Sequence, residues 1–319
     1  MEVKKIAPVA VFVYNRLDKA KNCIEALEKC LLTDQTELHV FADGAKGEKD
    51  KDKVEAVHKW LREYGEGSCS FSKVFLHIKE KNAGLASSII SGVTQLTNDY
   101  GKVIVVEDDL IVARSFLQYM NGALDYYEED DSIWEIASYG YNLKALRKYN
   151  HDIYLGYRAS SWGWATWKDR WDACDWEVND YEELKNSKEM QEKFCRGGGD
   201  LYPMLQRQMR GESDSWAIRW AYSCAMKDKY VIYPKVGQVS NDGFDGTGIH
   251  SGLHAPKSVF ADSSSKVIFE KVLLDPKITR EFYLMHTDTF LKKVKRNLSV
   301  KDIVKLIKRI GNTDGAATF

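Results

Sequence analysis

The chain has 319 residues, of which 46 are Lys or Arg and 47 are Asp or Glu, so its formal net charge is -1. An apolar fraction of 44% argues against disorder, and 22 Gly with 5 Pro exclude a collagen-like or low-complexity chain. The near-zero charge gives no overall reason to expect a nucleic-acid partner. A chain of this length can bury a large core, so we expect a folded globular protein.

The first apolar run, Ile6 to Tyr14, is too short to span a membrane and is followed by no small-residue cleavage site. It is therefore predicted to be a strand and not a signal peptide. The six cysteines contain no CxxC pair, so neither a zinc site nor a disulfide framework is indicated. We expect a cytoplasmic protein with reduced thiols.

The first 125 residues alternate between apolar strands and amphipathic helices. Strands are predicted at 9–13, 38–41, 74–78 and 102–106, and the helices between them at 18–31, 50–64 and 85–97. Fully apolar strands that alternate with helices are typical of a mostly parallel sheet covered on both faces. This pattern predicts an α/β fold.

The regular alternation fades beyond about residue 130. Short strands are predicted at 133–137, 153–155 and 230–233, and helices at 182–194, 201–209 and 215–227. Residues 241–265 are rich in Gly, Ser, Asp and His, which predicts a long loop of the kind that often has a function.

Polar residues directly follow three of the predicted strands. They are Asn15-Arg16 after the first strand, Asp43 after the second and the triplet Glu107-Asp108-Asp109 after the fourth. Ligands of open α/β sheets bind at the carboxyl ends of the strands. Three consecutive carboxylates repel one another unless a cation lies among them, and a hard divalent ion on phosphates is typically held by one or two carboxylates. Alternatively, the triplet only ends its strand or caps a helix that is expected to begin near Ala113.

These motifs resemble the GT-A nucleotide-sugar glycosyltransferases. Within them the chain is most similar to the N-acetylglucosaminyltransferase I type and to bacterial transferases that build surface polysaccharides. The resemblance rests on Arg16, on Asp43 and on Val-Val-Glu-Asp-Asp-Leu at 105–110, and it covers mainly the first 125 residues. It implies a GT-A, Rossmann-like, mostly parallel sheet flanked by helices. Residues 1–125 would be its nucleotide-sugar-binding half, and 126–289 the acceptor and catalytic half of the same domain.

The resemblance also implies roles for individual residues. The acidic triplet takes the place of the family's Asp-x-Asp motif, with Asp109 as the direct ligand of Mn²⁺ or Mg²⁺ and with Glu107 and Asp108 beside the sugar-nucleotide diphosphate. Further nucleotide contacts are implied for Arg16, Asp43, Asn82 and Gly84. Alternatively, Arg16 is a surface arginine without such a role.

The segment from Glu212 to Ala217 resembles the acidic-aromatic segment that presents the catalytic base in inverting members of the family. Displacement at an anomeric carbon needs a carboxylate to take the proton of the acceptor hydroxyl, and Asp214 is the candidate. Alternatively, Ser213 or Asp214 only caps the helix that contains Trp216. The two roles are compatible.

Eight of the nine tryptophans lie between residues 134 and 220. Sugars pack their C–H faces on aromatic rings, and similar segments border the sugar site in the family. Trp162, Trp164 and Trp216 are therefore candidates for contact with the donor sugar or the acceptor. Trp167 and Trp171, spaced i, i+4, are predicted to belong to the core.

Residues 239–252 resemble a flexible family loop that orders over the bound sugar nucleotide, and the glycines in it supply the backbone freedom such closure needs. His250 in this loop is a candidate contact for the donor. A lone His in a surface loop more often contacts neither phosphate nor metal.

Residues 290–310 carry eight Lys or Arg and one acid, with apolar residues at roughly helical spacing. A basic amphipathic helix can bind an anionic leaflet. The segment 290–319 would then bring the protein to the inner face of the cytoplasmic membrane and to a lipid-linked acceptor. Packing of this helix on the domain is the alternative.

The resemblance thus implies a metal-dependent, inverting hexosyl- or N-acetylhexosaminyl-transferase. It would move a sugar from a UDP-sugar to a glycan or a lipid-linked glycan in surface polysaccharide synthesis. One alternative is a sugar-nucleotide nucleotidyltransferase, against which the lack of Gly in Val13-Tyr14-Asn15-Arg16 counts. Another is a non-catalytic carbohydrate- or nucleotide-binding protein of the same fold.

Overall fold

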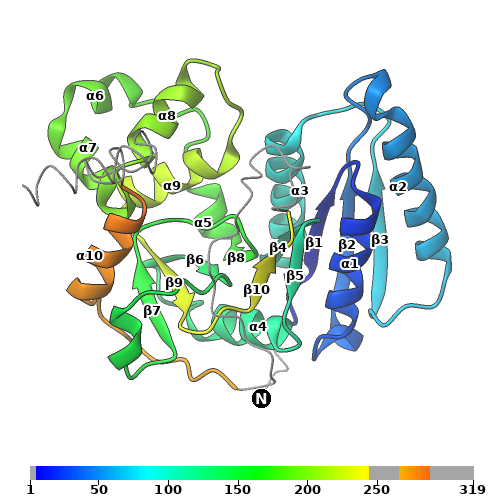
Figure 1. Ribbon diagram of the computed structural model, residues 1–319, viewed down its shortest axis with the longest axis horizontal. Helices are drawn as coiled ribbons and strands as arrows, with labels where there is room; N and C mark the ends of the chain where they lie inside the picture. The colour runs from blue at the N-terminus through cyan, green and yellow to red at the C-terminus, as the bar shows by residue number, and fades with distance from the viewer. Residues whose placement is uncertain (1–4, 244–265, 288–319) are drawn as a thin grey trace, which may run out of the picture.

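The computed structural model describes residues 5–243 and 266–287. The strands of its main sheet are β1 (Val9–Val13), β2 (Glu37–Ala42), β3 (Lys73–Ile78), β4 (Lys102–Glu107), β6 (Ile133–Ala137), β7 (Ile153–Gly156), β8 (Trp164–Trp167) and β9 (Tyr230–Pro234). A second sheet pairs β5 (Leu110–Val112) with β10 (Val239–Asn241) in antiparallel orientation. The main sheet has the strand order β3-β2-β1-β4-β8-β6-β9-β7 (Figure 1).

The helices lie on both faces of the main sheet. They are α1 (Leu17–Glu28), α2 (Glu48–Glu66), α3 (Leu85–Tyr100), α4 (Phe116–Tyr126), α5 (Lys168–Asp172), α6 (Tyr181–Asn186), α7 (Lys188–Phe194), α8 (Leu201–Met209), α9 (Trp216–Met226) and α10 (Pro276–Met285). One core cluster joins α1, α2 and α4 to one face, and a second joins α3, α5, α9 and α10 to the other. A third cluster lies among α6 to α9.

The first four strands of the main sheet are parallel to one another. Their apolar residues are buried on both faces in β1 and in most of β2 and β4, as parallel strands covered by helices require. The expected α/β fold with a large, mostly parallel sheet flanked by helices is confirmed.

The remaining strands extend the same sheet in mixed orientation. Strand β8 runs antiparallel to β4 on one side and to β6 on the other. Strand β9 is parallel to β6, and β7 is antiparallel to β9. The sheet is therefore continuous across residue 125, because β8 of the second half pairs directly with β4 of the first.

The acidic triplet is followed by a strand and not directly by a helix. Strand β5 begins at Leu110, immediately after Asp109, and pairs with β10, which lies more than a hundred residues later. The next helix, α4, begins at Phe116, so the expectation of a helix from about Ala113 placed its start too early. The pairing with β10 explains the difference, since it supplies the hydrogen bonds that make 110–112 a strand.

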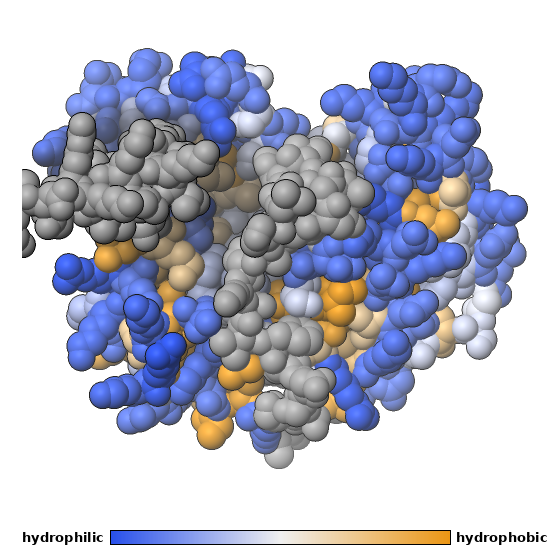
Figure 2. Space-filling model, in the orientation of Figure 1, coloured by the Kyte–Doolittle hydropathy of each residue, from blue (hydrophilic) through white to orange (hydrophobic). Residues whose placement is uncertain are grey.

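The surface in Figure 2 is mostly hydrophilic, with apolar residues in small separate areas. Among the residues that the structure describes, Leu273, at 82% exposure, and Ile268, at 65%, are the most exposed large apolar residues. None of the helices within residues 5–243 and 266–287 combines the length and the apolarity that crossing a membrane requires.

Gly163 marks a close approach of two backbone segments just before β8. Its φ of +66° lies in the left-handed region, and a Cβ atom there would overlap Ser138 Oγ. The Ser138 hydroxyl donates to the carbonyl of Gly163 at 2.7 Å. Position 163 therefore needs glycine for both its backbone angle and its space.

We expect Gly163→Ala to destabilise the protein more than Gly101→Ala, the matched control. Gly101 has a similar φ of +79°, but a Cβ atom added there would meet nothing within 4 Å. The left-handed angle costs an alanine about 1–2 kcal/mol at either site, and overpacking at position 163 adds about 1–3 kcal/mol. Urea unfolding measures the difference, and equal losses of unfolding free energy would contradict it.

Candidate functional site

The carboxyl ends of β1, β2 and β4 meet at one edge of the main sheet. Val13 pairs with Ala42, and Phe12 pairs with Glu107, so the three strands end at nearly the same level. The Asp108 amide donates to the Phe12 carbonyl at 3.1 Å, which carries the pairing one residue beyond β4. The structure thereby brings the polar residues that follow each strand to the same edge.

Arg16 forms ion pairs with two members of the acidic triplet. Its Nη2 donates to Asp108 Oδ1 and, at 3.0 Å, to Asp109 Oδ2. The exposed fraction of the side chain is only 23% for Arg16, 6% for Asp108 and 19% for Asp109. A positive charge of the protein itself therefore lies between these two carboxylates and offsets one of their two negative charges.

Burial is the main influence on the pKa values of Glu107 and Asp108. It raises the pKa of Glu107 to about 8, with Asp109 and Asp108 adding repulsion. Burial also raises the pKa of Asp108 to about 6, although the neighbouring Arg16 guanidinium acts in the opposite direction. Negative charge is thus disfavoured at Glu107, and the arginine lies on the other two carboxylates.

Asp109 is the member of the triplet that best fits a divalent cation. A Cβ atom on Gly243 would lie only 2.5 Å from Asp109 Oδ2 and 3.0 Å from Asn241 Oδ1, so the glycine leaves a small cradle beside these oxygens. Within the described ranges, no cluster of three or more His, Cys, Asp or Glu could hold a metal ion. No such cluster is needed where a cation is shared with the phosphates of a substrate, because one or two carboxylates then suffice.

The carboxylate of Asp43 holds the turn at 82–84 through hydrogen bonds. Its two carboxylate oxygens accept hydrogen bonds from the backbone amides of Ala83 and Gly84 and from Asn82 Nδ2, at 2.9 to 3.1 Å. The Asp43 side chain is buried in consequence. The three predicted nucleotide contacts Asp43, Asn82 and Gly84 thus form one unit, and Asp43 supports the turn from within.

Asp214 faces this turn from the second half of the chain, in the segment just before α9. A Cβ atom on Gly84 would lie 3.8 Å from Asp214 Oδ2. Asp214 Oδ1 accepts a hydrogen bond of 3.4 Å from Arg219, and the Asp214 side chain is 65% exposed. The structure therefore brings the candidate base to the nucleotide-binding edge predicted from the sequence.

The expected capping alternative for this segment is wrong. The N-cap of α9 is Ser215, whose Oγ accepts from the Ile218 amide at 3.4 Å. Neither Ser213 nor Asp214 is the cap, so the Asp214 carboxylate is not needed to start the helix.

Two of the three candidate sugar-binding tryptophans belong to the core. Trp164 is 0% and Trp216 is 4% exposed, and their rings stack with centroids 4.9 Å apart. This burial corrects the sequence-based expectation for both, because neither ring offers a face to a sugar. Trp162 is only partly buried and remains the candidate contact. Trp167 and Trp171 are buried as expected.

Two other predicted features lie outside the described residues. They are His250 with most of its loop, and the basic segment 290–310.

Sequence reasoning missed the buried carboxylate of Glu135 in β6. The side chain is completely buried, and its two oxygens accept hydrogen bonds of 2.7 Å from the Ser160 amide and from Trp220 Nε1. Burial raises its pKa to about 8. Glu135 thereby ties the segment that leads to Trp162 to helix α9. The available signal was a single carboxylate within the apolar run from Ile133 to Ala137.

Sequence reasoning also missed a contact between α1 and the residues after β10. Lys19 Nζ donates to the carbonyl and to the carboxylate of Asp242, at 2.6 and 2.9 Å. The Asp242 amide in turn donates to the Asp109 carbonyl at 2.8 Å. The start of the predicted donor loop is thus fixed on the acidic triplet.

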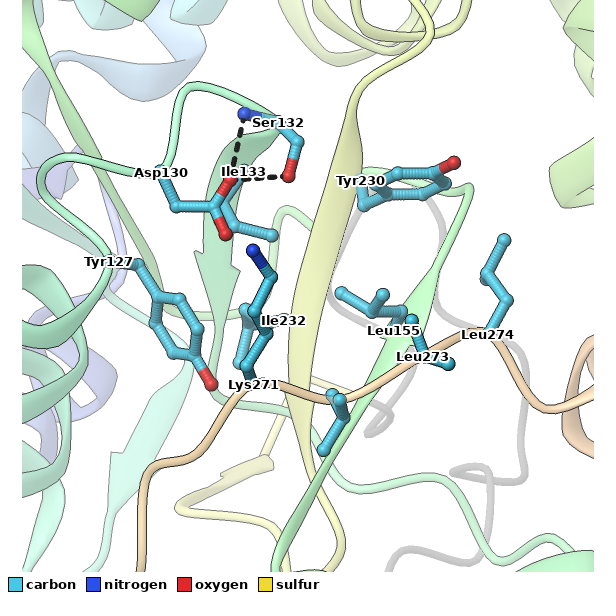
Figure 3. A pocket seen from close by; sticks show the side chains of 11 residues that line it. Tyr127, Asp130, Ser132, Ile133, Leu155, Tyr230, Ile232, Lys271, Leu273 and Leu274 are labelled. Carbon is cyan, nitrogen blue, oxygen red and sulfur yellow. Dashed lines mark hydrogen bonds between the residues drawn. The ribbon is translucent and has the colours of Figure 1, made fainter.

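A cavity of about 370 Å³ lies away from these residues (Figure 3). Ile133 and Tyr230, which begin β6 and β9, contribute to its wall, so it lies towards the amino ends of these strands. Its lining is mainly apolar and includes Leu155, Ile232 and Leu273. None of the predicted site residues lines it.

No family model and no curated protein matches the sequence. Among solved structures, TarS from S. aureus is similar over 41% of this chain and 21% of its own, with 16% identity and a TM-score of 0.28. TarS 1–349 in complex with UDP is similar over 42% of this chain and 36% of its own, with 15% identity and a TM-score of 0.29. The chain thus matches only a minor part of either TarS structure.

The mannosyltransferase PcManGT from Pyrobaculum calidifontis, in complex with GDP-Man and Mn²⁺, is similar over more of the chain. The match covers 69% of this chain and 73% of that one, with 12% identity and a TM-score of 0.38. At these TM-scores the likenesses assign no role to any residue of this chain.

We expect Glu135 to make stability depend on pH. Its pKa is about 8 in the folded protein against a usual 4.5, so unfolding releases a proton between these values. The contribution of Glu135 to stability is complete below pH 4.5 and is lost as the pH rises towards 8. Relative to Glu135→Gln, the wild type should lose up to about 1.4 kcal/mol of unfolding free energy per pH unit in this window.

Urea unfolding at several pH values within this window measures the difference. Glu55→Gln is the matched control, because Glu55 is an exposed residue of α2 and should leave the pH profile unchanged. A Glu135→Gln profile parallel to that of the wild type would show that Glu135 does not titrate in this range.

Proposed function

We propose that the protein is a metal-dependent, inverting glycosyltransferase that uses a nucleotide-sugar donor. The observation that carries the proposal is the position of Asp214. Its exposed carboxylate faces Gly84, in the turn that Asp43 holds at the carboxyl end of β2. A carboxylate that is exposed at a ligand-binding sheet edge and is not needed as a helix cap is suited to accept a proton.

The proposal divides the site between donor and acceptor. Arg16 and the turn 82–84 would contact the nucleotide, and Asp109, with Asp108 beside it, would hold Mn²⁺ or Mg²⁺ on the diphosphate. A bound cation would supply charge neutralisation for the departing diphosphate. Asp214 would take the proton from the acceptor hydroxyl as that oxygen attacks the anomeric carbon, and a single displacement of this kind inverts the configuration.

The finer parts of the proposal follow the resemblance of the sequence motifs. The donor would be a UDP-sugar carrying a hexose or an N-acetylhexosamine, as in the N-acetylglucosaminyltransferase I type. The acceptor would be a glycan or a lipid-linked glycan of a surface polysaccharide, with Trp162 packed on a sugar ring. Residues 290–310 would bring the enzyme to the cytoplasmic membrane.

The turn after β1 weighs against the nucleotidyltransferase alternative. Tyr14 and Asn15 both donate side-chain hydrogen bonds of 3.1 Å to the carboxylate of Asp50 in α2. A phosphate-cradling loop uses free backbone amides and glycines, whereas this turn is fixed by its side chains.

Asp214→Asn should leave donor binding intact and lower kcat by about 10²- to 10⁴-fold, because the amide cannot accept the acceptor proton. Calorimetry with UDP and Mn²⁺ measures binding, and release of UDP from a UDP-sugar with acceptor measures turnover. Asp131→Asn changes another exposed acid, which lies away from this edge, and should behave as wild type. Wild-type turnover in Asp214→Asn would refute the assignment of the base.

Asp109→Asn should abolish the dependence of donor binding on Mn²⁺, since it removes the carboxylate best placed for the cation. Titration of UDP into the wild type and the variant, each with Mn²⁺ and with EDTA, measures the effect. Asp172→Asn, an exposed acid of α5, is the control. If the variant keeps a full Mn²⁺ dependence, the cation binds elsewhere.

A further inference from the structure

The acidic edge already contains a cation, the guanidinium of Arg16. One nitrogen of this group, Nη2, contacts both Asp108 Oδ1 and Asp109 Oδ2. The pair is largely screened from solvent, with 23% of the Arg16 side chain and 19% of the Asp109 side chain exposed. Attraction between partly buried charges is less weakened by water than attraction at an open surface.

A divalent cation on Asp109 would compete with this contact. Arg16 Nη2 lies 3.0 Å from Asp109 Oδ2, and a hard cation such as Mg²⁺ binds a carboxylate oxygen at about 2.0–2.1 Å. The two positive charges would then lie within a few ångströms of each other. Their repulsion favours departure of the guanidinium from Asp109 whenever the cation arrives.

The backbone of Arg16 is fixed, so only its side chain has to move. Arg16 immediately precedes α1, and its carbonyl accepts the Ala20 amide at 3.0 Å as the first hydrogen bond of that helix. No carboxylate other than Asp108 and Asp109 pairs with the Arg16 guanidinium among the described residues. A diphosphate at this edge would offer the guanidinium a new partner, since arginine binds phosphate oxygens with two parallel hydrogen bonds.

We propose that Arg16 is a built-in counter-ion that competes with the divalent cation for Asp109 and moves to the donor's diphosphate when both ligands bind. The inference rests on the proposed function, because it takes the donor and the cation from it. The consequence is cooperative binding. A bound nucleotide attracts Arg16 away from Asp109, so the cation no longer has to compete with Arg16 for that carboxylate. By linkage, the cation strengthens nucleotide binding by the same factor.

Electron paramagnetic resonance of free Mn²⁺ measures how tightly the full chain binds Mn²⁺, and it needs no turnover. The wild type should bind Mn²⁺ weakly alone and at least about fivefold more tightly in saturating UDP. Arg16→Gln should bind Mn²⁺ alone at least about fivefold more tightly than the wild type, and UDP should strengthen its Mn²⁺ binding by a smaller factor than in the wild type. Arg16→Lys, which keeps the charge but not the fork, should lie between them and serves if the Gln variant fails to fold.

Lys21→Gln is the matched control for net charge. It removes one positive charge from the same helix, but the Lys21 ammonium lies over the Trp60 ring, 5.9 Å from its centroid, and Lys21 is not one of the residues of the candidate site. The control should keep most of the UDP effect on Mn²⁺ binding. If it matches Arg16→Gln, the effect reports general charge, and the inference is overturned.

Two further outcomes would overturn the inference. One is an Arg16→Gln protein that binds Mn²⁺ no more tightly than the wild type, and the other is the absence of Mn²⁺ binding in every variant. The second outcome is distinguishable from failure of the proposed function: sugar transfer that continues in EDTA would keep the transferase proposal and remove its metal. The absence of both sugar transfer and UDP binding would refute the proposed function itself.

Discussion

The pairing of β1 with β2 on one side and with β4 on the other determines which polar residues of this protein lie together at one edge of the sheet. Because the three strands are parallel and end at one level, the residues that follow them meet, although they lie far apart in the sequence. The strands themselves are apolar and buried, and polar groups begin only where the strands stop. The sheet thus separates a core that carries stability from an edge that carries charge.

The second half of the chain reaches this edge through two buried connections. Strand β8 adds directly to β4, and Glu135 joins helix α9 to the segment at Ser160 through its two carboxylate oxygens. The tryptophan rings of β8 and α9 fill the space between these elements, with Trp164 stacked on Trp216. Their contribution to the site is therefore the placement of α9, at whose start Asp214 projects towards the turn 82–84.

Sequence patterns predicted the first half well because its strands are continuous apolar runs with a clear end. The run from Val9 to Val13 is one example, and the polar residues after it and after β4 identified the edge. Strands β5, β8 and β10 were not predicted, since each is short and is defined by a partner remote in the chain. Local composition contains no information on such pairing.

Contacts between side chains of the candidate site were likewise not predicted from the sequence. Arg16 and Asp109 were both identified, but the ion pair between them was not, because the triplet was expected to need a bound metal. A tryptophan next to a glycine is compatible with either a binding face or a core position, and only the structure distinguishes Trp162 from Trp164. Glu135 was missed because a carboxylate in a short apolar strand gives no sign of its partners.

Two basic residues at the start of α1 make contacts that depend on the number of residues between them as well as on the residue types. Arg16 contacts the acids after β4, and Lys19 contacts Asp242 after β10. The residues are three positions apart, a spacing that places side chains on the same face of a helical turn. Inserting or deleting one residue between them would rotate one by about 100° relative to the other. A change in the length of this turn would therefore break at least one of the two contacts, even if both basic side chains were kept.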